Sequence, residues 1–301
     1  MYKPLLPPSG GNIEESQYGE LPYPMYASLK EDGVRGETLN GDAKTRQLKP
    51  IPNVYIRSEI NKAFAGIPFN ISGEICSGPN VQTSTSAVMS EDGEPEFTFG
   101  LFSLVGEVNE TPFSQRYIML KAIAKKLPKW VHVIEQVVVN NEKELKDFVD
   151  NAFKLGYEGV VLRSINGRHK DGRSTLTEPL MLRIVKKKME EAVILSCYEQ
   201  MENTNEKKTN ALGRSERSSA KAGKVGKGIL GGWEVRDIKT GIEFRIGGGK
   251  GVDDNFREFW WKPENRKKMP GMIIKYSSKE HGVKEKPRQP QYECFRDRRD
   301  M

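Results

Sequence analysis

Cysteine and long apolar segments are both scarce in this sequence. Only three of its 301 residues are cysteine, and Cys76, Cys197 and Cys294 are isolated from one another. Scattered cysteines in odd number favour neither a disulfide framework nor a four-cysteine zinc site, so reduced thiols are expected. No apolar run could span a bilayer, and residues 1–24 lack the pattern of a secretory signal. A cytoplasmic protein with no membrane partner is expected.

The sequence also lacks a phosphate-binding loop of the Gly-Lys-Ser/Thr kind. Its glycine-rich segment 247–251 has neither a serine or threonine after the lysine nor the strand-then-helix setting that such a loop requires. We therefore interpret residues 247–251 as a turn, and nucleotide binding, if present, must use other residues.

Composition indicates soluble globular material, with 36% hydrophobic and 30% charged residues, and the length is sufficient for two domains. The net charge of +7 fits a nucleic-acid partner without proving one. Residues 207–227 hold a single acidic residue, Glu216, and are rich in Ser, Asn and Gly. The basic residues of this stretch are Lys207, Lys208, Arg214, Arg217, Lys221, Lys224 and Lys227. We expect a flexible basic loop that binds DNA phosphates, or simply a solvated surface loop.

Lys30 is the candidate nucleophile. A free lysine has a pKa of roughly 10.4, so its amine attacks only when burial or neighbouring cations favour the neutral form. Asp32-Gly33 follows it and predicts a tight turn that lets the backbone approach a ligand, and Arg35 adds a cation. Taken alone, the same residues also suit an exposed turn between two strands.

The pattern Lys30-x-Asp32-Gly33-x-Arg35 resembles motif I of the covalent nucleotidyltransferases, which include DNA ligases, RNA ligases and mRNA capping enzymes. In that superfamily the lysine accepts AMP or GMP as a phosphoramidate. The resemblance extends from about Tyr23 to the end of the chain. It implies that Lys30 is catalytic and that Leu29, Lys30 and Arg35 bind the nucleotide.

Three further motifs follow in the expected order. Thr45-Arg46 resembles the pair whose arginine contacts the nucleotide or the 5′-phosphate of a nick, which implies a nucleotide and DNA contact for Arg46. Gly73-Glu74 resembles the Asp-Gly-Glu strand, with Ser72 in place of the aspartate, so Glu74 is expected to bind ribose hydroxyls and to contribute to a metal site. Phe102 corresponds to the aromatic that stacks on the purine, and Ser103 replaces the usual acid after it.

The remaining motifs lie in the second half of the chain. Glu158 begins a segment resembling motif IV and is the first candidate for Mg²⁺, which prefers oxygen ligands. Before the Glu191-Ala192 pair of motif V, Arg183 and Val185 occupy the two lysine positions, while Lys186 and Lys188 have the right spacing in a shifted register. Arg296, followed by Asp297, Arg298 and Arg299, resembles motif VI and is expected to orient the pyrophosphate of ATP.

Hydrophobic periodicity predicts the secondary structure in outline. After an extended lead-in over residues 1–24, helices are expected at 55–65, 112–128, 142–155 and 254–261, with Ser114 as the N-cap of the second and Gly156 ending the third. Strands are expected at 25–29, 34–39, 69–75, 96–105, 131–139, 192–198, 228–237, 242–246 and 271–276.

Together the resemblance and this pattern predict an α+β nucleotidyltransferase (ATP-grasp-like DNA ligase) domain over residues 1–188 and an all-β OB-fold DNA-binding domain over residues 189–301. The implied function is that of a compact, bacteriophage-type ATP-dependent DNA ligase, active in DNA repair, replication and recombination. It would seal 5′-phosphate/3′-hydroxyl nicks through lysyl-AMP and adenylylated DNA. The expected cofactors are ATP and Mg²⁺, the expected partner is nicked duplex DNA, and a monomer in the cytoplasm, or in the host cell cytoplasm of a virus, is expected.

Other functions stay open at this point. Motif I is shared, so the chain could be an RNA ligase or a capping guanylyltransferase. The ligases that use NAD⁺ as AMP donor carry a nicotinamide-recognition domain and a cysteine-ligated zinc module. Neither is expected in this sequence, so NAD⁺ is disfavoured as the donor. Val185 and Ser103 also allow a non-catalytic nucleic-acid-binding protein whose active site has decayed.

Overall fold

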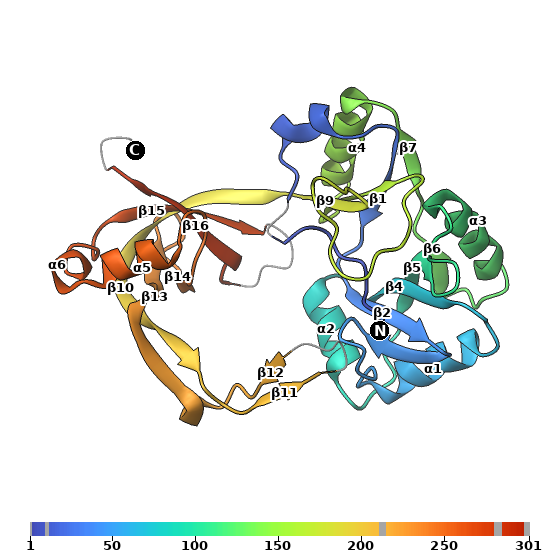
Figure 1. Cartoon of the computed structure of the whole chain (residues 1–301), viewed down its shortest axis with the longest axis horizontal. Helices are drawn as coiled ribbons and strands as arrows, with labels where there is room; N and C mark the ends of the chain where they lie inside the picture. Colours follow the sequence, from blue (N-terminus) through green and yellow to red (C-terminus); the bar gives the residue numbers. More distant parts are fainter. Residues whose placement is uncertain (1, 10–11, 211–214, 280–284, 298–301) are drawn as a thin grey trace. The chain divides into compact units, whose positions relative to one another are not determined.

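A computed structural model describes residues 2–9, 12–210, 215–279 and 285–297 (Figure 1). The described chain forms two compact units, of which the first ends at Lys186 and the second begins at Lys187. The first unit mixes helices with two sheets, whereas the second is built mainly of strands.

A five-stranded sheet in the first unit has the order β3-β2-β4-β5-β6. Its strands are β2 (Val34–Leu39), β3 (Asp42–Thr45), β4 (Asn70–Cys76), β5 (Thr98–Val105) and β6 (Val131–Val133). Neighbouring strands are antiparallel except β5 and β6, which are parallel. Because side chains alternate along a strand, Ile71, Ile75 and Phe99 face a buried core on one side. Polar side chains of β2 and β4 lie on the other side.

A second sheet in the same unit has the order β7-β1-β8-β9 and is antiparallel throughout. Its strands are β1 (Met25–Lys30), β7 (Val137–Val139), β8 (Gly159–Ser164) and β9 (Met181–Val185). Met25, Ala27 and Leu162 face a buried core to which helix α4 (Glu142–Lys154) also contributes. Figure 1 shows α4 beside this sheet. By alternation Lys30, Arg163 and other polar residues occupy the opposite face.

Four α-helices and a 3-10 helix complete the first unit. They are η1 (Glu15–Glu20), α1 (Val54–Phe64), α2 (Val81–Met89), α3 (Phe113–Ala124) and α4 (Glu142–Lys154). Asparagines begin three of them: the side chains of Asn53, Asn80 and Asn141 accept hydrogen bonds from backbone amides of the first turn. In α4 the residues Leu145, Val149 and Ala152 are buried, as the apolar stripe of that segment predicts.

The second unit contains a five-stranded antiparallel sheet with the order β14-β13-β10-β15-β16. Its strands are β10 (Lys187–Asn203), β13 (Lys224–Asp237), β14 (Glu243–Ile246), β15 (Ile273–Lys279) and β16 (Arg288–Arg296). Helices α5 (Asp254–Trp261) and α6 (Pro263–Arg266) accompany it, and Trp233 and Tyr276 are fully buried in its core. A small hairpin of β11 (Lys207–Thr209) and β12 (Ser215–Arg217) follows β10, and the 3-10 helix η2 (Lys221–Gly223) precedes β13.

Several sequence predictions of local structure are wrong. Residues 131–139 form two short strands in different sheets, because the chain leaves one sheet after Val133 and enters the other at Val137. Ser114 does not cap its helix: Pro112 occupies the N-cap position, and the helix ends at Ala124, before Pro128.

Other errors concern segments predicted to be irregular. The described part of the basic stretch 207–227 forms strands and a helical turn instead of an irregular loop, and the lead-in contains η1. The periodicity also missed β3, α2, β9, α6 and β16, whereas the resemblance to motif IV predicted β8. Among the described residues, none of the helices is both long and apolar enough to cross a bilayer.

Candidate active site

Lys30 lies at the end of β1, where it pairs with Gly159 of β8. This pairing places Glu158, the residue before β8, next to the lysine side chain. The Nζ of Lys30 donates to Oε2 of Glu158 in direct contact, and its distance to the carbonyl of Glu31 is 3.4 Å. The side chain of Lys30 is 25% exposed, whereas that of Glu158 is 1% exposed. The lysine side chain is therefore partly exposed, while its acidic partner is buried.

Two opposing effects act on the pKa of Lys30. Burial lowers the pKa of its amine, but the negative charges of Glu158, Glu74 and Asp32 together outweigh burial, so the net pKa is raised. The amine is consequently an ammonium ion at neutral pH. It becomes a nucleophile only after it gives up a proton.

Glu74 on β4 lies opposite Arg35 on β2. Its Oε1 accepts a hydrogen bond of 3.2 Å from the backbone amide of Gly33. Burial raises the pKa of Glu74 to about 7, the Lys30 and Arg35 charges act against this rise, and Glu158 adds to it. Only glycine fits at position 33, since a Cβ there would lie 2.4 Å from the carbonyl oxygen of Ile75. The tight turn after Lys30 thus brings Glu74 into the electrostatic environment of the lysine.

Phe102 of β5 is in contact with two guanidinium groups. The Cζ atoms of Arg35 and Arg163 lie 5.1 and 5.4 Å from the centroid of its ring. Arg163 is 3% exposed, and its Cζ also lies 4.8 Å from the centroid of the Phe113 ring. Burial, with the nearby charges of Arg116 and Arg35, moves the pKa of Arg163 well below its usual value. Sequence reasoning missed Arg163 although it lies only five residues after Glu158.

The motif V residues differ in their positions. Arg183 pairs with Val161 on the same sheet as Lys30. Burial lowers the pKa of Arg183, Glu158 opposes this, and Arg173 adds to it, so Arg183 lies in the electrostatic neighbourhood of Glu158. Lys186 is exposed between β9 and β10. Lys188 belongs to the second unit, where its Nζ lies 2.6 Å from Oε1 of Glu190. Within the first unit, Arg183 thus lies near the acidic partner of Lys30.

Three other predicted residues have different surroundings. Leu29 packs its side chain into the core on the opposite face of β1, which leaves only its backbone for the nucleotide. Arg46 is exposed in the turn after β3. Arg296 belongs to the second unit, where its Nε donates to Oε1 of Glu191 at 2.9 Å.

The predicted DNA contacts are exposed. Lys207, Lys208, Arg217, Lys221, Lys224 and Lys227 all lie on β11, β12, η2 and β13 with accessible side chains. Arg214 lies outside the described residues, as do Arg298 and Arg299 of the motif VI segment.

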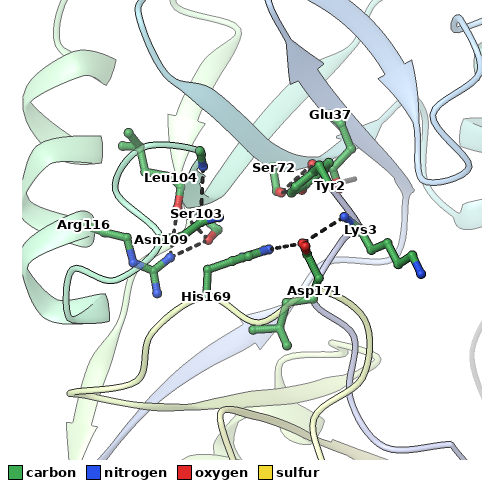
Figure 2. A network of polar contacts seen from close by, with 12 residues as sticks. Tyr2, Lys3, Glu37, Ser72, Ser103, Leu104, Asn109, Arg116, His169 and Asp171 are labelled. Carbon is green, nitrogen blue, oxygen red and sulfur yellow. Dashed lines mark hydrogen bonds and ion pairs between the residues drawn. The ribbon is translucent and has the colours of Figure 1, made fainter. Parts of the chain in front are cut away.

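Both serines that stand where the resemblance expects acids are buried and hydrogen-bonded. Ser72 donates to Oε2 of Glu37 at 2.6 Å, and the same oxygen accepts from the hydroxyl of Tyr2 at 2.9 Å (Figure 2). Ser103 accepts from Arg116 at 3.3 Å. Arg116 also donates to the carbonyl oxygens of Thr111, Leu104 and Gly167. Glu37, on the same strand face as Arg35, is a site residue that alternation along β2 could have identified.

A second ion pair adjoins the nucleophile. Nε2 of His132 lies 2.7 Å from Oε1 of Glu31, the residue after Lys30. The hydrogen bond to Glu31 raises the pKa of His132, although partial burial opposes this. A Cβ at Gly100 would lie 2.4 Å from Oε2 of Glu31, so glycine at position 100 makes room for the pair.

The oxygen donors near Lys30 could supply only some of the ligands that a Mg²⁺ ion needs. Among the residues that the structure describes, no three His, Cys, Asp or Glu side chains are grouped as a metal site. Glu158 and Glu74 nevertheless both act on Lys30, so two carboxylates face one place. Mg²⁺ commonly takes one or two carboxylates and completes its shell with water and phosphate oxygens, and these two residues suit that arrangement.

Comparison with known proteins places this geometry in a family. The model of the ATP-dependent DNA ligase domain matches residues 23–177, just over half of the chain. A DNA ligase of variola virus is 24% identical over 188 residues, covering 56% of this chain and 34% of its own length. The chain thus spans about a third of the length of the curated relatives it matches.

Solved structures extend the likeness to both units. A chlorella virus DNA ligase-adenylate is 26% identical with a TM-score of 0.55, and the match covers 98% of each chain. A structure from a study of Lig E DNA ligases, 19% identical, has a TM-score of 0.68 over 95% of this chain and 97% of its own, which bears on the fold alone. The predicted fold class, a nucleotidyltransferase domain followed by an OB-fold domain, is confirmed. The chain belongs to the ATP-dependent DNA ligase family.

Proposed function

We propose that this chain is an ATP-dependent DNA ligase that seals nicks between a 5′-phosphate and a 3′-hydroxyl in duplex DNA. The observation that carries the proposal is the cluster around Lys30. This partly exposed lysine contacts buried Glu158 through its amine. Glu74, Arg35 and Arg183 belong to the same electrostatic environment. A lysine held among carboxylates and arginines suits an in-line attack on a phosphate, in which positioning and charge neutralisation provide most of the catalysis.

In the first step the neutral amine of Lys30 attacks the α-phosphate of ATP. The Nζ–P bond forms, the bond to the bridging oxygen breaks, and pyrophosphate leaves. The carboxylate of Glu158 contacts the amine directly and is the acceptor that the geometry offers for the lysine proton. AMP then passes to the 5′-phosphate of the nick, and the 3′-hydroxyl displaces AMP to close the backbone.

The side chains of the candidate site have separate roles in this proposal. Arg35 and Glu74 hold the ribose and phosphates, Phe102 stacks on the purine, and Arg183 with Lys186 or Lys188 neutralises the phosphate charge. When bound, Mg²⁺ would share the carboxylates of Glu158 and Glu74 with the ATP phosphates and reduce the negative charge that raises the pKa of Lys30.

The purine would stack on Phe102 beside the guanidinium groups of Arg35 and Arg163, which already lie against that ring. Arg46 and the exposed basic residues of β11, β12, η2 and β13 would bind the DNA backbone.

We assign the adenylylation chemistry and the binding of DNA to different parts of the chain. Residues 1–188 would form the adenylyltransferase domain, and residues 189–301 the OB-fold domain that binds nicked DNA, with Arg296 orienting the pyrophosphate. Arg296 would have to exchange Glu191 for phosphate oxygens in order to act. A monomer suffices for this scheme.

The proposal is tested by labelling with nucleotide and chasing with a nick. The protein is incubated with Mg²⁺ and α-labelled ATP or GTP, and the labelled protein is then given nicked duplex DNA or nicked duplex RNA. Label from ATP that appears in sealed DNA supports the proposal. Label from GTP alone would indicate a capping guanylyltransferase, sealing of RNA alone would indicate an RNA ligase, and salt-sensitive DNA binding without label would indicate a non-catalytic binding protein.

A further inference from the structure

We propose that Tyr2 and Glu37 are positioning residues that set the orientation of Arg35 for the nucleotide. The inference rests on the proposed function, because it concerns the same site. It assigns roles to two residues outside the motif I pattern, one of them at the beginning of the chain.

Glu37 is the centre of the arrangement. It is 1% exposed, and its Oε1 accepts from Nε of Arg35 at 2.7 Å. Its Oε2 accepts from the hydroxyls of Ser72 and Tyr2 at 2.6 and 2.9 Å. A buried carboxylate requires this number of partners to remain charged, and each partner limits the rotation of the side chain. Glu37 is thereby fixed, and it fixes the guanidinium of Arg35 in turn.

Arg35 retains capacity for a ligand after these contacts. Besides its bond to Glu37, it donates to the carbonyl of Leu5 at 2.8 Å and to the hydroxyl of Ser72 at 3.3 Å. A guanidinium group has five N–H donors, so three of them are used by the protein. The remaining donors are held in one orientation, which is what bidentate binding of a phosphate or a ribose requires.

The charge balance of the site makes Glu37 important. Burial and the nearby charges of Arg116 and Arg35 lower the pKa of Arg163, and the negative charge of Glu37 opposes them. Glu37 pairs with Ser72 across the sheet, and Ser72 pairs with Ser103. At both serine positions the resemblance expects an acid. Glu37 therefore supplies, from the neighbouring strand, the buried negative charge that positions 72 and 103 lack.

The segment that carries Tyr2 is attached independently of the Tyr2 hydroxyl. The ring of Tyr2 stacks on His169 with centroids 5.6 Å apart, and the backbone amide of Lys3 donates to Asp171 at 2.9 Å (Figure 2). The backbone of Leu6 exchanges hydrogen bonds with Gly172 and Ser174. A Tyr2→Phe substitution thus removes the hydroxyl while the segment keeps its other contacts.

The test compares ATP use by the full chain with Tyr2→Phe, Glu37→Gln and Tyr23→Phe. Tyr23 is the matched control, because its hydroxyl donates to the carbonyl of Tyr18 outside the site. Self-adenylylation is followed over a range of ATP concentrations, and thermal unfolding is measured for each variant. Loss of one hydrogen bond to a charged group should raise KM for ATP about fivefold in Tyr2→Phe, and more in Glu37→Gln, with kcat changed less than KM. Tyr23→Phe should leave KM unchanged.

A double-mutant cycle separates positioning from simple structural support. If Tyr2 acts through Arg35, then Tyr2→Phe in an Arg35→Ala background should add no further increase in KM. An unchanged KM in Tyr2→Phe, or an equal increase with and without Arg35, would overturn the inference. A loss of thermal stability without a change of KM would overturn it as well.

A binding measurement keeps this inference distinguishable from the ligase proposal. ATP affinity is measured by calorimetry in a Lys30→Met background, in which no adduct can form. Weaker ATP binding on addition of Tyr2→Phe supports the positioning role even if wild-type protein forms no adduct, an outcome that would refute only the ligase proposal. Equal ATP affinities, or no ATP binding by wild-type protein, would overturn the positioning role.

Discussion

The Lys30 amine and the Glu158 carboxylate are in direct contact, although 128 residues separate them in the chain. The contact exists because β1 and β8 pair with Lys30 opposite Gly159. It keeps the amine protonated and accessible, next to a group that can accept its proton. Resting charge and proposed reactivity of Lys30 therefore both depend on Glu158.

Replacing Glu158 with Gln should shift the pH dependence of self-adenylylation. The Glu158 charge is the main cause that raises the pKa of Lys30, so its removal should lower that pKa. Since the neutral amine is the nucleophile, the rate of adduct formation should rise with pH in wild-type protein and should rise at lower pH in the variant. The maximal rate should fall, because the proton acceptor is lost. Rates of label incorporation between pH 6 and 10 check this, and an unshifted profile would contradict it.

Replacing Glu74 with Gln should reduce adduct formation and raise the thermal stability at pH 8. The pKa of Glu74 is raised from its ordinary value of 4.5 to about 7, so the folded state binds the proton more tightly than the unfolded state. The free energy of unfolding therefore falls as pH rises from about 4.5 to 7 through this group. At pH 8 the variant should have a higher Tm than wild type but should form little adduct. A lower Tm at pH 8 would show that the charged Glu74 is stabilising.

The pair of His132 and Glu31 should stabilise the fold only in its protonated form. The pKa of His132 is raised from 6.5, so its contribution is fully present below about pH 6.5 and is lost as pH rises through the folded-state pKa. His132→Gln should lower Tm more at pH 6 than at pH 9, and Glu31→Gln should show the same pattern. Equal losses of Tm at both pH values would mean that the pair contributes through packing alone.

The exposed lysines near the start of β13 should contribute to DNA binding. Changing Lys221, Lys224 and Lys227 together to Ala should weaken binding to nicked duplex and reduce the slope of log K against log salt by about 0.9 for each lost phosphate contact. Self-adenylylation should be unaffected. The control variant, Lys125, Lys126 and Lys129 all changed to Ala, removes the same charge from exposed positions that follow α3. If both triple variants bind equally, the basic stretch has no specific role.

Periodicity predicted those elements whose side chains follow one regular pattern. The stripe of α4 and the alternation of β4 were readable because each element has one face on a core. Residues 131–139 are mostly apolar, and composition does not reveal that the chain leaves one sheet after Val133 and enters the other at Val137. Helix α2 is rich in Ser and Thr, which are poor helix formers, so its beginning depends on the Asn80 cap.

The candidate site was predictable from sequence only where motifs are local. Lys30, Glu74 and Glu158 follow from their neighbours in the chain, and alternation along β2 would have added Glu37. Tyr2 is 35 residues from Glu37, and His132 is 101 residues from Glu31, so no local pattern connects either pair. Such contacts become visible only once the strands and the first segment have been placed in space.

The fate of label at Lys30 tests most directly whether this lysine is the nucleophile that accepts AMP. Wild-type protein and a Lys30→Ala variant are incubated with Mg²⁺ and α-labelled ATP, digested, and the labelled peptide is identified before a chase with nicked duplex DNA. If Lys30 is the nucleophile, label should reside on Lys30 of the wild-type protein alone and should pass into sealed DNA. Label at another residue, or equal label on the Lys30→Ala variant, would contradict it.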